Sequence, residues 1–281
     1  MSILVVGSLH LDVVLRAPHL PALDETVAGT SVEYVFGGKG GNQAIAAARM
    51  GGDVRFAGRA GSDPFGDMLR ETLKYNDIDL DLLQLDEGPS GMSSATVDAN
   101  GEYGAVIVSA ANLHIDPDQI EVSPNVSLVL LQNEIPTEVN VRIADMAKRI
   151  GAQVWLNAAP ARHCPQELLA LIDVLIVNRA EAQWYTDAPT SAAWLNTLGP
   201  DGVMFDGDVF EAFKVNTCST HGAGDMFIGA LAARVDNGAS IKEAIPFAQA
   251  AAALHVSMSN SERSALGPAR VNAFIAAHDK R

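Results

Sequence analysis

The feature that most constrains this fold is a regular alternation of short apolar runs with helical segments, from about residue 115 onward. Residues 126–131, 154–156 and 174–177 are continuous apolar runs typical of buried strands, and residues 139–149 form a helical pattern between the first two. Strands that alternate with helices pair in parallel through right-handed crossovers. The sequence therefore predicts an α/β fold with a mainly parallel central sheet, to which residues 3–6 add another buried strand.

Polar residues follow these predicted strands at the point where each strand ends. Glu134, Asn157, Asn178 and Glu181 occupy such positions. Because parallel strands bring their carboxyl ends to one edge, and ligands of open α/β sheets bind at that edge, these residues mark a candidate site. Asp12 follows the first strand in the same way. From position alone it is either a ligand-binding carboxylate or a turn residue.

Two segments depart from this pattern and predict a second, smaller sheet. Residues 13–37 contain β-prone runs and turns without a helical pattern. Residues 93–97 and 103–108 are β-prone and flank Asp98-Ala-Asn-Gly101, which is typical of a hairpin turn. We expect a single domain over residues 1–281, in which segments of approximately 13–37 and 92–110 are inserted in the α/β core as a lid.

The segment 37–51 contains a glycine-rich turn followed by an alanine-rich helix. It is the first of two segments in which such a turn opens a helix. Gly40 follows Lys39 where the P-loop requires Ser or Thr, so the segment is not a P-loop. Gln43 stands in place of the last glycine of the dinucleotide-binding fingerprint, which excludes that motif as well. Lys39 and Asn42 are candidate hydrogen-bond donors to a polar ligand, and the alternative is a purely structural turn.

Gly222, Ala223, Gly224 and Asp225 form the second such turn and precede a strongly apolar helical run. The free N–H groups of a helix N-terminus and the helix dipole suit a phosphate or a developing oxyanion. Asp is a favoured N-cap residue, and these four residues taken alone favour that role for Asp225. The alternative is a base beside an anion-binding turn, and the rest of the chain favours this alternative.

Composition restricts the partners and the compartment. The net charge of −15 argues against nucleic acid and anionic membranes as partners, since both are bound through Lys and Arg. The two cysteines, Cys164 and Cys218, form no disulfide framework and indicate a reducing, cytoplasmic location. The N-terminus lacks the pattern of a signal peptide, and no uncharged apolar run approaches the length of a membrane span.

Five further segments lie outside these motifs and predict elements of the core. Residues 54–57 predict a strand, 58–67 a loop and 68–75 a helix. After the second glycine-rich turn, residues 240–257 predict a long alanine-rich helix and 259–268 a polar loop. The small residues of the long helix favour close packing on the core and indicate no chemistry.

Taken together, these motifs resemble those of the ribokinase family, the PfkB-type carbohydrate and nucleoside kinases. The resemblance covers essentially the whole chain and implies a three-layer α/β/α core with a small β-sheet lid. Each motif alone is weak, but five in the right order are strong: Gly7-Ser-Leu-His-Leu-Asp12, the segment 37–51, Leu156-Asn-Ala-Ala-Pro-Ala-Arg162, Asn178-x-x-Glu181 and Gly222-Ala-Gly-Asp225.

The resemblance implies an ATP-dependent kinase that phosphorylates a hydroxyl, expected to be a hydroxymethyl group, of a small sugar. Asp225 would be the general base, and Gly222, Ala223 and Gly224 would form the anion hole. The implied sugar-binding residues are His10, Asp12, Gly38, Lys39, Asn42 and Glu134. The implied ATP-binding residues are Asn178, Glu181, Thr197, Gly199 and Gly202, with Glu181 holding Mg²⁺ through water.

Three residues depart from the family pattern. Ser219 stands where the family has an Asp of its monovalent-cation site, so a requirement for a monovalent cation is not implied. His10 replaces an Asn at the sugar, which leaves the identity of the sugar open. His221 replaces a small residue or Thr beside the anion hole.

Two alternatives to a sugar kinase remain. One is a nucleoside kinase of the same family, against which the glycine-rich segment 37–42 favours a sugar. The other is a sugar-binding protein on a kinase fold without useful catalysis, suggested by Ser219 and a short segment between Glu181 and Thr197. The kinase is favoured because Asp225 and both glycines of its turn are present. The family also implies a homodimer formed through the lid.

Overall fold

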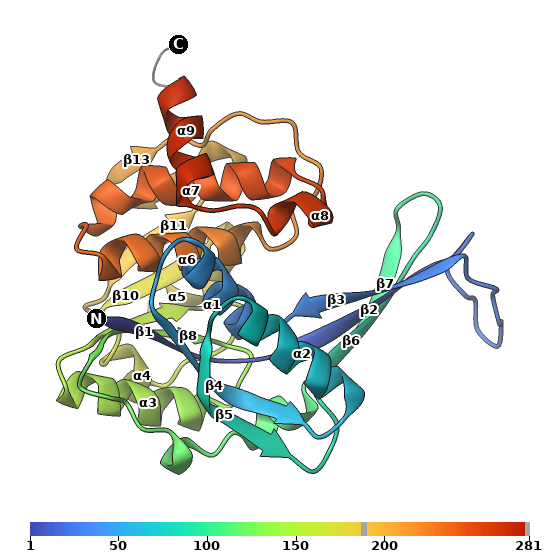
Figure 1. Ribbon diagram of the computed structural model, residues 1–281, viewed down its shortest axis with the longest axis horizontal. Coiled ribbons are helices and arrows are strands. Elements are labelled where there is room, and N and C mark those ends of the chain that lie inside the picture. The colour runs from blue at the N-terminus through green and yellow to red at the C-terminus, as the bar shows by residue number, and fades with distance from the viewer. Residues whose placement is uncertain (187–189, 279–281) are drawn as a thin grey trace.

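The computed structural model describes residues 1–186 and 190–278, which fold into a layered core with a separate small sheet (Figure 1). Within these residues, nine strands form the central sheet in the order β13-β12-β11-β10-β9-β8-β1-β4-β5. They are β1 (Ser2–Val6), β4 (Val54–Gly61), β5 (Asp79–Asp86), β8 (Val126–Gln132), β9 (Gln153–Asn157), β10 (Val174–Asn178), β11 (Ala193–Thr197), β12 (Val203–Phe205) and β13 (Asp208–Phe210). All pair in parallel except β12 and β13, which add an antiparallel edge, so the predicted mainly parallel sheet is confirmed.

Helices cover both faces of this sheet, because alternate strand residues point to opposite faces and both sets are apolar. Ile3 and Val5 pack against one helical layer, α1 (Lys39–Arg49), α2 (Pro64–Tyr75), α6 (Ala223–Asp236), α7 (Ile241–Ser257) and α9 (Pro268–His278). Leu4 and Val6 pack against the other, α3 (Thr137–Arg149), α4 (Gln166–Leu169) and α5 (Arg179–Tyr185). The three-layer α/β/α core is confirmed. No helix within the described ranges has the length and apolarity needed to cross a membrane.

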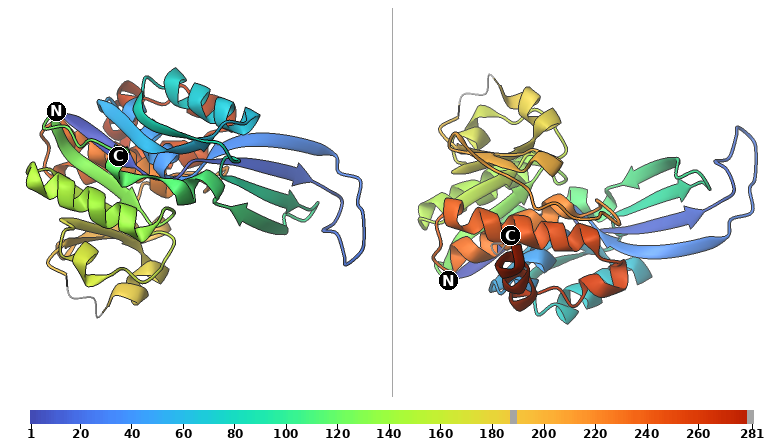
Figure 2. Two further views of the ribbon diagram at one scale, coloured as in Figure 1. Left: turned by 90° about the horizontal axis from the view of Figure 1, so that it is seen from below. Right: turned by 90° about the horizontal axis from the view of Figure 1, so that it is seen from above.

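The second sheet extends away from the core in both views of Figure 2. Its strands are β2 (His10–Arg16), β3 (Ser31–Gly37), β6 (Met92–Val97) and β7 (Tyr103–Val108), in the order β3-β2-β6-β7. β2 and β6 pair in parallel, and the outer pairs are antiparallel. The small sheet predicted from the two inserted segments is therefore confirmed, and β3 and β7 are its edges.

The sequence prediction was wrong for part of the region between residues 54 and 86. β4 continues through Gly61 in place of the predicted loop. Its glycines fit where neighbouring backbone lies too close for a Cβ atom: a Cβ atom at Gly61 would lie 2.5 Å from the oxygen of Gly88. Helix α2 begins at Pro64, four residues earlier than predicted, and Asp63 caps it by accepting a hydrogen bond from the Gly66 N–H. The strand β5 was not predicted.

Part of the predicted polar loop 259–268 is also helical. The short helix α8 (Asn260–Arg263) begins after Ser259, whose hydroxyl and the Glu262 carboxylate form a capping box. Three short 3₁₀ helices complete the described elements, at Ala110–His114, Pro117–Gln119 and Gly199–Asp201. The segment between Glu181 and Thr197 that the sequence analysis noted as short includes residues 187–189, which lie outside the described residues.

Candidate active site

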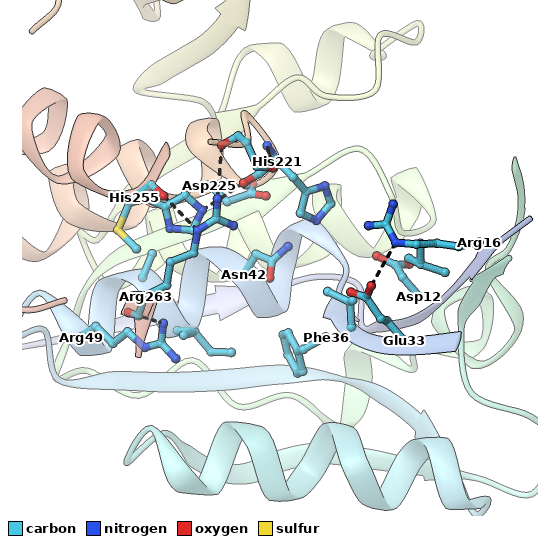
Figure 3. Close-up of a pocket in the computed structure, with 17 residues that line it drawn as sticks. Asp12, Arg16, Glu33, Phe36, Asn42, Arg49, His221, Asp225, His255 and Arg263 are labelled. Atoms are coloured by element: carbon cyan, nitrogen blue, oxygen red, sulfur yellow. Dashed lines mark hydrogen bonds and ion pairs between the residues drawn. The ribbon is translucent and has the colours of Figure 1, made fainter. Parts of the chain in front are cut away.

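A cavity of about 290 Å³ lies between the second sheet, helix α1 and the N-terminus of α6 (Figure 3). It brings together four residues that the sequence predicted for the site, Asp12, Asn42, Gly222 and Asp225. These residues come from three elements that are distant in sequence. A volume of this size suits a small ligand with a few polar contacts.

The second sheet supplies one wall of the cavity. Asp12, Val14 and Arg16 alternate along β2, so all three point to the same face, and Glu33 and Val35 line the cavity from β3. The Oδ1 atom of Asp12 accepts a hydrogen bond of 2.5 Å from the Ser93 hydroxyl on β6. The Asp12 carboxylate is thereby fixed at the rim between the small sheet and the core.

The N-terminus of α6 forms the opposite wall. Gly222 is its N-cap residue with φ of 74°, in the left-handed region that favours glycine. Asp225 is the third residue of the helix and makes no capping bond, so the interpretation of Asp225 as an N-cap is wrong. Within the described chain, the backbone amides of Gly224 and Asp225 donate to no other residue. Two N–H groups are therefore free to bind an anion beside the Asp225 carboxylate.

The Asp225 carboxylate is partly buried and surrounded by charged and polar groups. Gln43 Nε2 donates to its Oδ1 atom at 3.0 Å. Burial raises the pKa of Asp225, and the positive charge of Lys39 and the bond from Gln43 oppose that rise. The nearby Glu134 raises the pKa further, and His221 lowers it. A carboxylate whose pKa is raised is a better proton acceptor than an exposed one.

Helix α1 starts at the carboxyl end of β1. Gly38 is its N-cap residue with φ of 88°, and a Cβ atom there would lie 2.7 Å from the Ser8 oxygen. The Oε2 atom of Glu134 accepts hydrogen bonds from the Ser8 hydroxyl at 2.5 Å and from the Lys39 amide at 2.8 Å. Glu134 thus binds the N-terminus of α1, where a negative charge is stabilised by the helix dipole.

Four of the predicted sugar-binding residues lie outside the lining of the cavity as the described residues define it: His10, Gly38, Lys39 and Glu134. His10 is buried, and burial lowers its pKa even though Glu134 and Asp12 oppose the shift. Its imidazole is therefore neutral near pH 7. Its Nε2 atom is buried and has no partner among the described residues.

The predicted ATP-binding residues lie together at the ends of β10 and β11, apart from the cavity. Asn178 and Thr197 are register partners on these strands. Asn178 caps α5, and its backbone N–H donates to Glu181 Oε2 at 2.9 Å in a capping box. Burial raises the pKa of Glu181, and Lys39 opposes this. The positive charge of Lys39 therefore acts on carboxylates in both groups of residues, Glu181 and Asp225.

Gly199 and Gly202 delimit the turn that follows β11. Gly202 has φ of 109°, and a Cβ atom there would lie 2.0 Å from the Phe210 oxygen, so only glycine fits. Leu198 N–H donates to the Gly202 oxygen at 2.8 Å and closes the turn. The Asp201 carboxylate in this turn pairs with the Arg179 guanidinium at the start of α5, which joins the turn to the end of β10.

Arg263 and His255 line the cavity but were not predicted. The buried Arg263 guanidinium donates to the backbone oxygens of His255 at 2.9 Å and Ser219 at 3.2 Å. Burial lowers the pKa of His255 to about 4, and its Nε2 atom bonds the His221 oxygen at 3.0 Å. These bonds hold the loop before α6. Nothing in the sequence indicates them, because Arg263 and Ser219 are 44 residues apart.

The chain matches the family model of the pfkB family carbohydrate kinases over residues 1–266. It is 34% identical over 271 residues to a ribokinase of Bacillus subtilis, covering 91% of this chain and 92% of that protein. These matches extend through both groups of site residues.

Two solved structures share the fold over nearly the full length. The ribokinase of Thermotoga maritima superposes with a TM-score of 0.86 at 29% identity, covering 98% of this chain and 99% of that one. The ribokinase of Arabidopsis thaliana, in complex with ribose and ATP, gives a TM-score of 0.89 at 28% identity, covering 97% and 98%. The resemblance found in the sequence motifs is confirmed.

Proposed function

This chain belongs to the pfkB family of carbohydrate kinases, and we propose that it transfers the terminal phosphoryl group of ATP to a hydroxymethyl group of a small, pentose-like sugar. The observation that carries the proposal is the position of Asp225. It lies beside two free amides at the start of α6, in a cavity that Asp12 and Asn42 also line. The relative from Arabidopsis thaliana binds ribose and ATP, which supports a sugar as the acceptor.

In the proposed reaction, Asp225 accepts the proton of the sugar hydroxyl through Oδ2, because Gln43 occupies Oδ1. The hydroxyl oxygen forms a bond to the terminal phosphorus, the bond from that phosphorus to the ADP oxygen breaks, and ADP leaves with the electron pair. The free amides of Gly224 and Asp225 stabilise the charge on the transferring group, and Gly222 and Ala223 form the turn that presents them. The predicted contribution of the Ala223 amide is not supported, because this amide donates to the Thr220 oxygen at 3.2 Å.

The sugar is proposed to bind between the small sheet and α1. Asp12 accepts hydrogen bonds from sugar hydroxyls, and Asn42 both donates and accepts them. Gly38 and Lys39 form the turn that closes the site behind Asn42, and Glu134 holds this turn in place. His10 lies behind Asp12 and shapes the site, with its free Nε2 available to a sugar hydroxyl after small movements.

The nucleotide is proposed to lie along the ends of β10 and β11, against Asn178, Thr197, Gly199 and Gly202. Glu181 fits a magnesium ion held through water, since it is a buried carboxylate with one oxygen not hydrogen-bonded in the described structure. When bound with ATP, the ion supplies positive charge to the phosphate oxygens. Lys39 adds positive charge that acts on both Glu181 and Asp225.

The small sheet is proposed to act as a lid and as the dimer interface. One of its faces lines the cavity through β2 and β3. The edge strand β7 exposes apolar side chains, among them Val106 at 66% and Ile107 at 65% of their full accessible area. An edge strand with exposed apolar residues is suited to pairing with a second copy of the chain.

The proposal is tested by ATP consumption with Mg²⁺ against pentoses, hexoses and nucleosides, with and without potassium. We expect turnover on a sugar, and no dependence on potassium because Ser219 offers no carboxylate. Turnover restricted to nucleosides would show that the acceptor is a nucleoside and that the protein is a nucleoside kinase of the same family. No turnover by folded protein that binds sugar but not ATP in calorimetry would identify a sugar-binding protein instead.

A further inference from the structure

Asp225 is tied to helix α1 by a buried amide. Gln43 Nε2 donates to Asp225 Oδ1 at 3.0 Å, and Gln43 is fully buried. Among the described residues, no group donates a hydrogen bond to Asp225 Oδ2. The two carboxylate oxygens are therefore different: one is held by the protein, and the other has no protein donor, on a residue that lines the cavity.

The orientation of Gln43 is set by a second buried amide. An ionised carboxylate can only accept, so Gln43 must present its NH₂ group to Asp225 and its oxygen to the opposite side. On that side Gln132 Nε2 donates to Gln43 Oε1 at 3.0 Å. Gln132 is also fully buried. If the Gln43 amide were rotated by half a turn, both hydrogen bonds would be lost. Two acceptors would then face each other at Asp225, and two donors would face each other at Gln132.

The end of β8 and the end of β1 hold Gln132 in place. Its backbone oxygen accepts a hydrogen bond from Asn140 Nδ2 at 2.8 Å. Its Oε1 atom lies against Gly7, where a Cβ atom would be only 1.9 Å away. The three side chains Gln132, Gln43 and Asp225 thus form a directed chain of hydrogen bonds from the central sheet through α1 to α6.

We propose that Gln43, oriented by Gln132, is a positioning residue for the proposed base: it holds Asp225 Oδ1 and turns Oδ2 toward the substrate hydroxyl. This inference rests on the proposed function, in which Asp225 accepts the proton. It assigns a role in the reaction to two glutamines that do not line the cavity. It also explains why β8 ends in a buried amide beside a glycine.

The arrangement has a consequence for the pH dependence of the reaction. Burial and Glu134 raise the pKa of Asp225, whereas Gln43, Lys39 and His221 lower it. Loss of the Gln43 donor removes one of the lowering effects, so the pKa of Asp225 rises further. A smaller fraction of the base is then ionised at a given pH, and the acid limb of the rate profile moves to higher pH.

The test compares kcat and KM across pH for Gln43→Met and Gln132→Glu with the wild type, using Mg-ATP and the accepted sugar. In Gln43→Met the donor is gone, and kcat falls about 10- to 100-fold at neutral pH with little change in KM. In Gln132→Glu the ionised carboxylate can only accept hydrogen bonds. It therefore favours the rotated Gln43 amide, whose NH₂ group faces residue 132 and whose oxygen faces Asp225. This variant should show a loss of similar size, and in both the acid limb moves to higher pH.

The matched control is Gln249→Met. Gln249 is a buried glutamine on α7 that does not line the cavity and whose Nε2 donates to the Phe210 oxygen at 2.7 Å. Its loss lowers Tm without moving the acid limb. If Gln43→Met behaves like Gln249→Met, with a lower Tm and an unmoved limb, the positioning role is refuted.

Two measurements separate failure of this inference from failure of the proposed function. If Asp225→Asn keeps full turnover, the base assignment fails, whatever the glutamines do. If Asp225→Asn is inactive but the pH profile of Gln43→Met is unchanged, only the inference fails. Titration of ¹³C-labelled aspartate by NMR tests the bond without turnover: the pKa of Asp225 must rise in Gln43→Met, and an unchanged pKa overturns the inference.

Discussion

The close contact between α1 and α6 gives a quantitative prediction for Gly229→Ala. Gly229 is one helical turn after Asp225, on the same face of α6. A Cβ atom at this position would lie 2.5 Å from Ala46 Cβ and 2.6 Å from both Ala47 N and the Gln43 oxygen. Two of these three atoms are backbone, so side-chain rotation cannot relieve the contact. Restoring a normal carbon–carbon separation of about 3.5 Å requires the helices to move apart by about 1 Å.

The expected cost follows from two opposing effects. Overpacking a rigid core site destabilises the folded protein by roughly 1–3 kcal/mol, and the three rigid contacts at Gly229 place the cost near about 3 kcal/mol. Replacing glycine by alanine in a helix stabilises by about 1 kcal/mol. The net destabilisation is about 2 kcal/mol, or roughly 4–8 °C in Tm. A 1 Å displacement of Asp225 from Gln43 and the sugar should also lower kcat by about 100-fold.

Thermal denaturation and steady-state kinetics measure these two effects. The stability control is Gly224→Ala, which adds the same methyl group to the same helix where nothing lies within 4 Å. It should not lower Tm. A Gly229→Ala variant as stable as the wild type would refute the tight α1–α6 contact, and with it the reasoning that places Asp225 against α1.

Three further predictions follow from the site and the small sheet. Asp225→Asn should raise Tm, because burial raises the pKa of Asp225 and its ionisation therefore weakens the native state. The gain in Tm should be full above the pKa of Asp225 in the native protein and should vanish below about pH 4, and an equal gain at pH 3 and pH 8 would contradict this reasoning. Gly38→Ala should lower the free energy of unfolding by at least about 2 kcal/mol in chemical denaturation, since it adds a clash with Ser8 to the strain of a positive φ. The control Gly51→Ala has a similar φ without such a clash and should lower it by about 1 kcal/mol. Ile107→Lys should convert a dimer to a folded monomer in sedimentation, and an unchanged mass would exclude β7 from the interface.

Much of the fold could be predicted because its signals are local. The apolar runs at residues 126–131 and 174–177 each predict a buried strand without knowledge of the partner strand. The glycine-rich starts of α1 and α6 are also local, since the backbone there needs glycine for its own conformation and for close approach. β5 was missed because aspartates interrupt its leucines, so the segment has no continuous apolar run, and most of its residues are only half-buried. In β4 the glycines indicate a loop, whereas crowding by adjacent backbone requires them in the strand.

The site could be predicted in part, for a different reason. Asp12, Asn42, Gly222 and Asp225 were identified by resemblance, and the fold brings all four to one cavity. Gln43 was noted only because it excludes a dinucleotide-binding motif. Its role depends on contacts that span 89 and 182 residues of sequence, and local pattern carries no information on such pairs. The same holds for Arg263 and the loop before α6.

The central claim is that Asp225 takes the proton from a sugar hydroxyl during phosphoryl transfer. The most direct measurement is kcat of Asp225→Asn with Mg-ATP and the accepted sugar, beside the wild type. We expect kcat to fall by about 10²–10⁴-fold, with KM for the sugar within a few-fold and the protein at least as stable as the wild type. Turnover at the wild-type rate by folded Asp225→Asn would contradict the account.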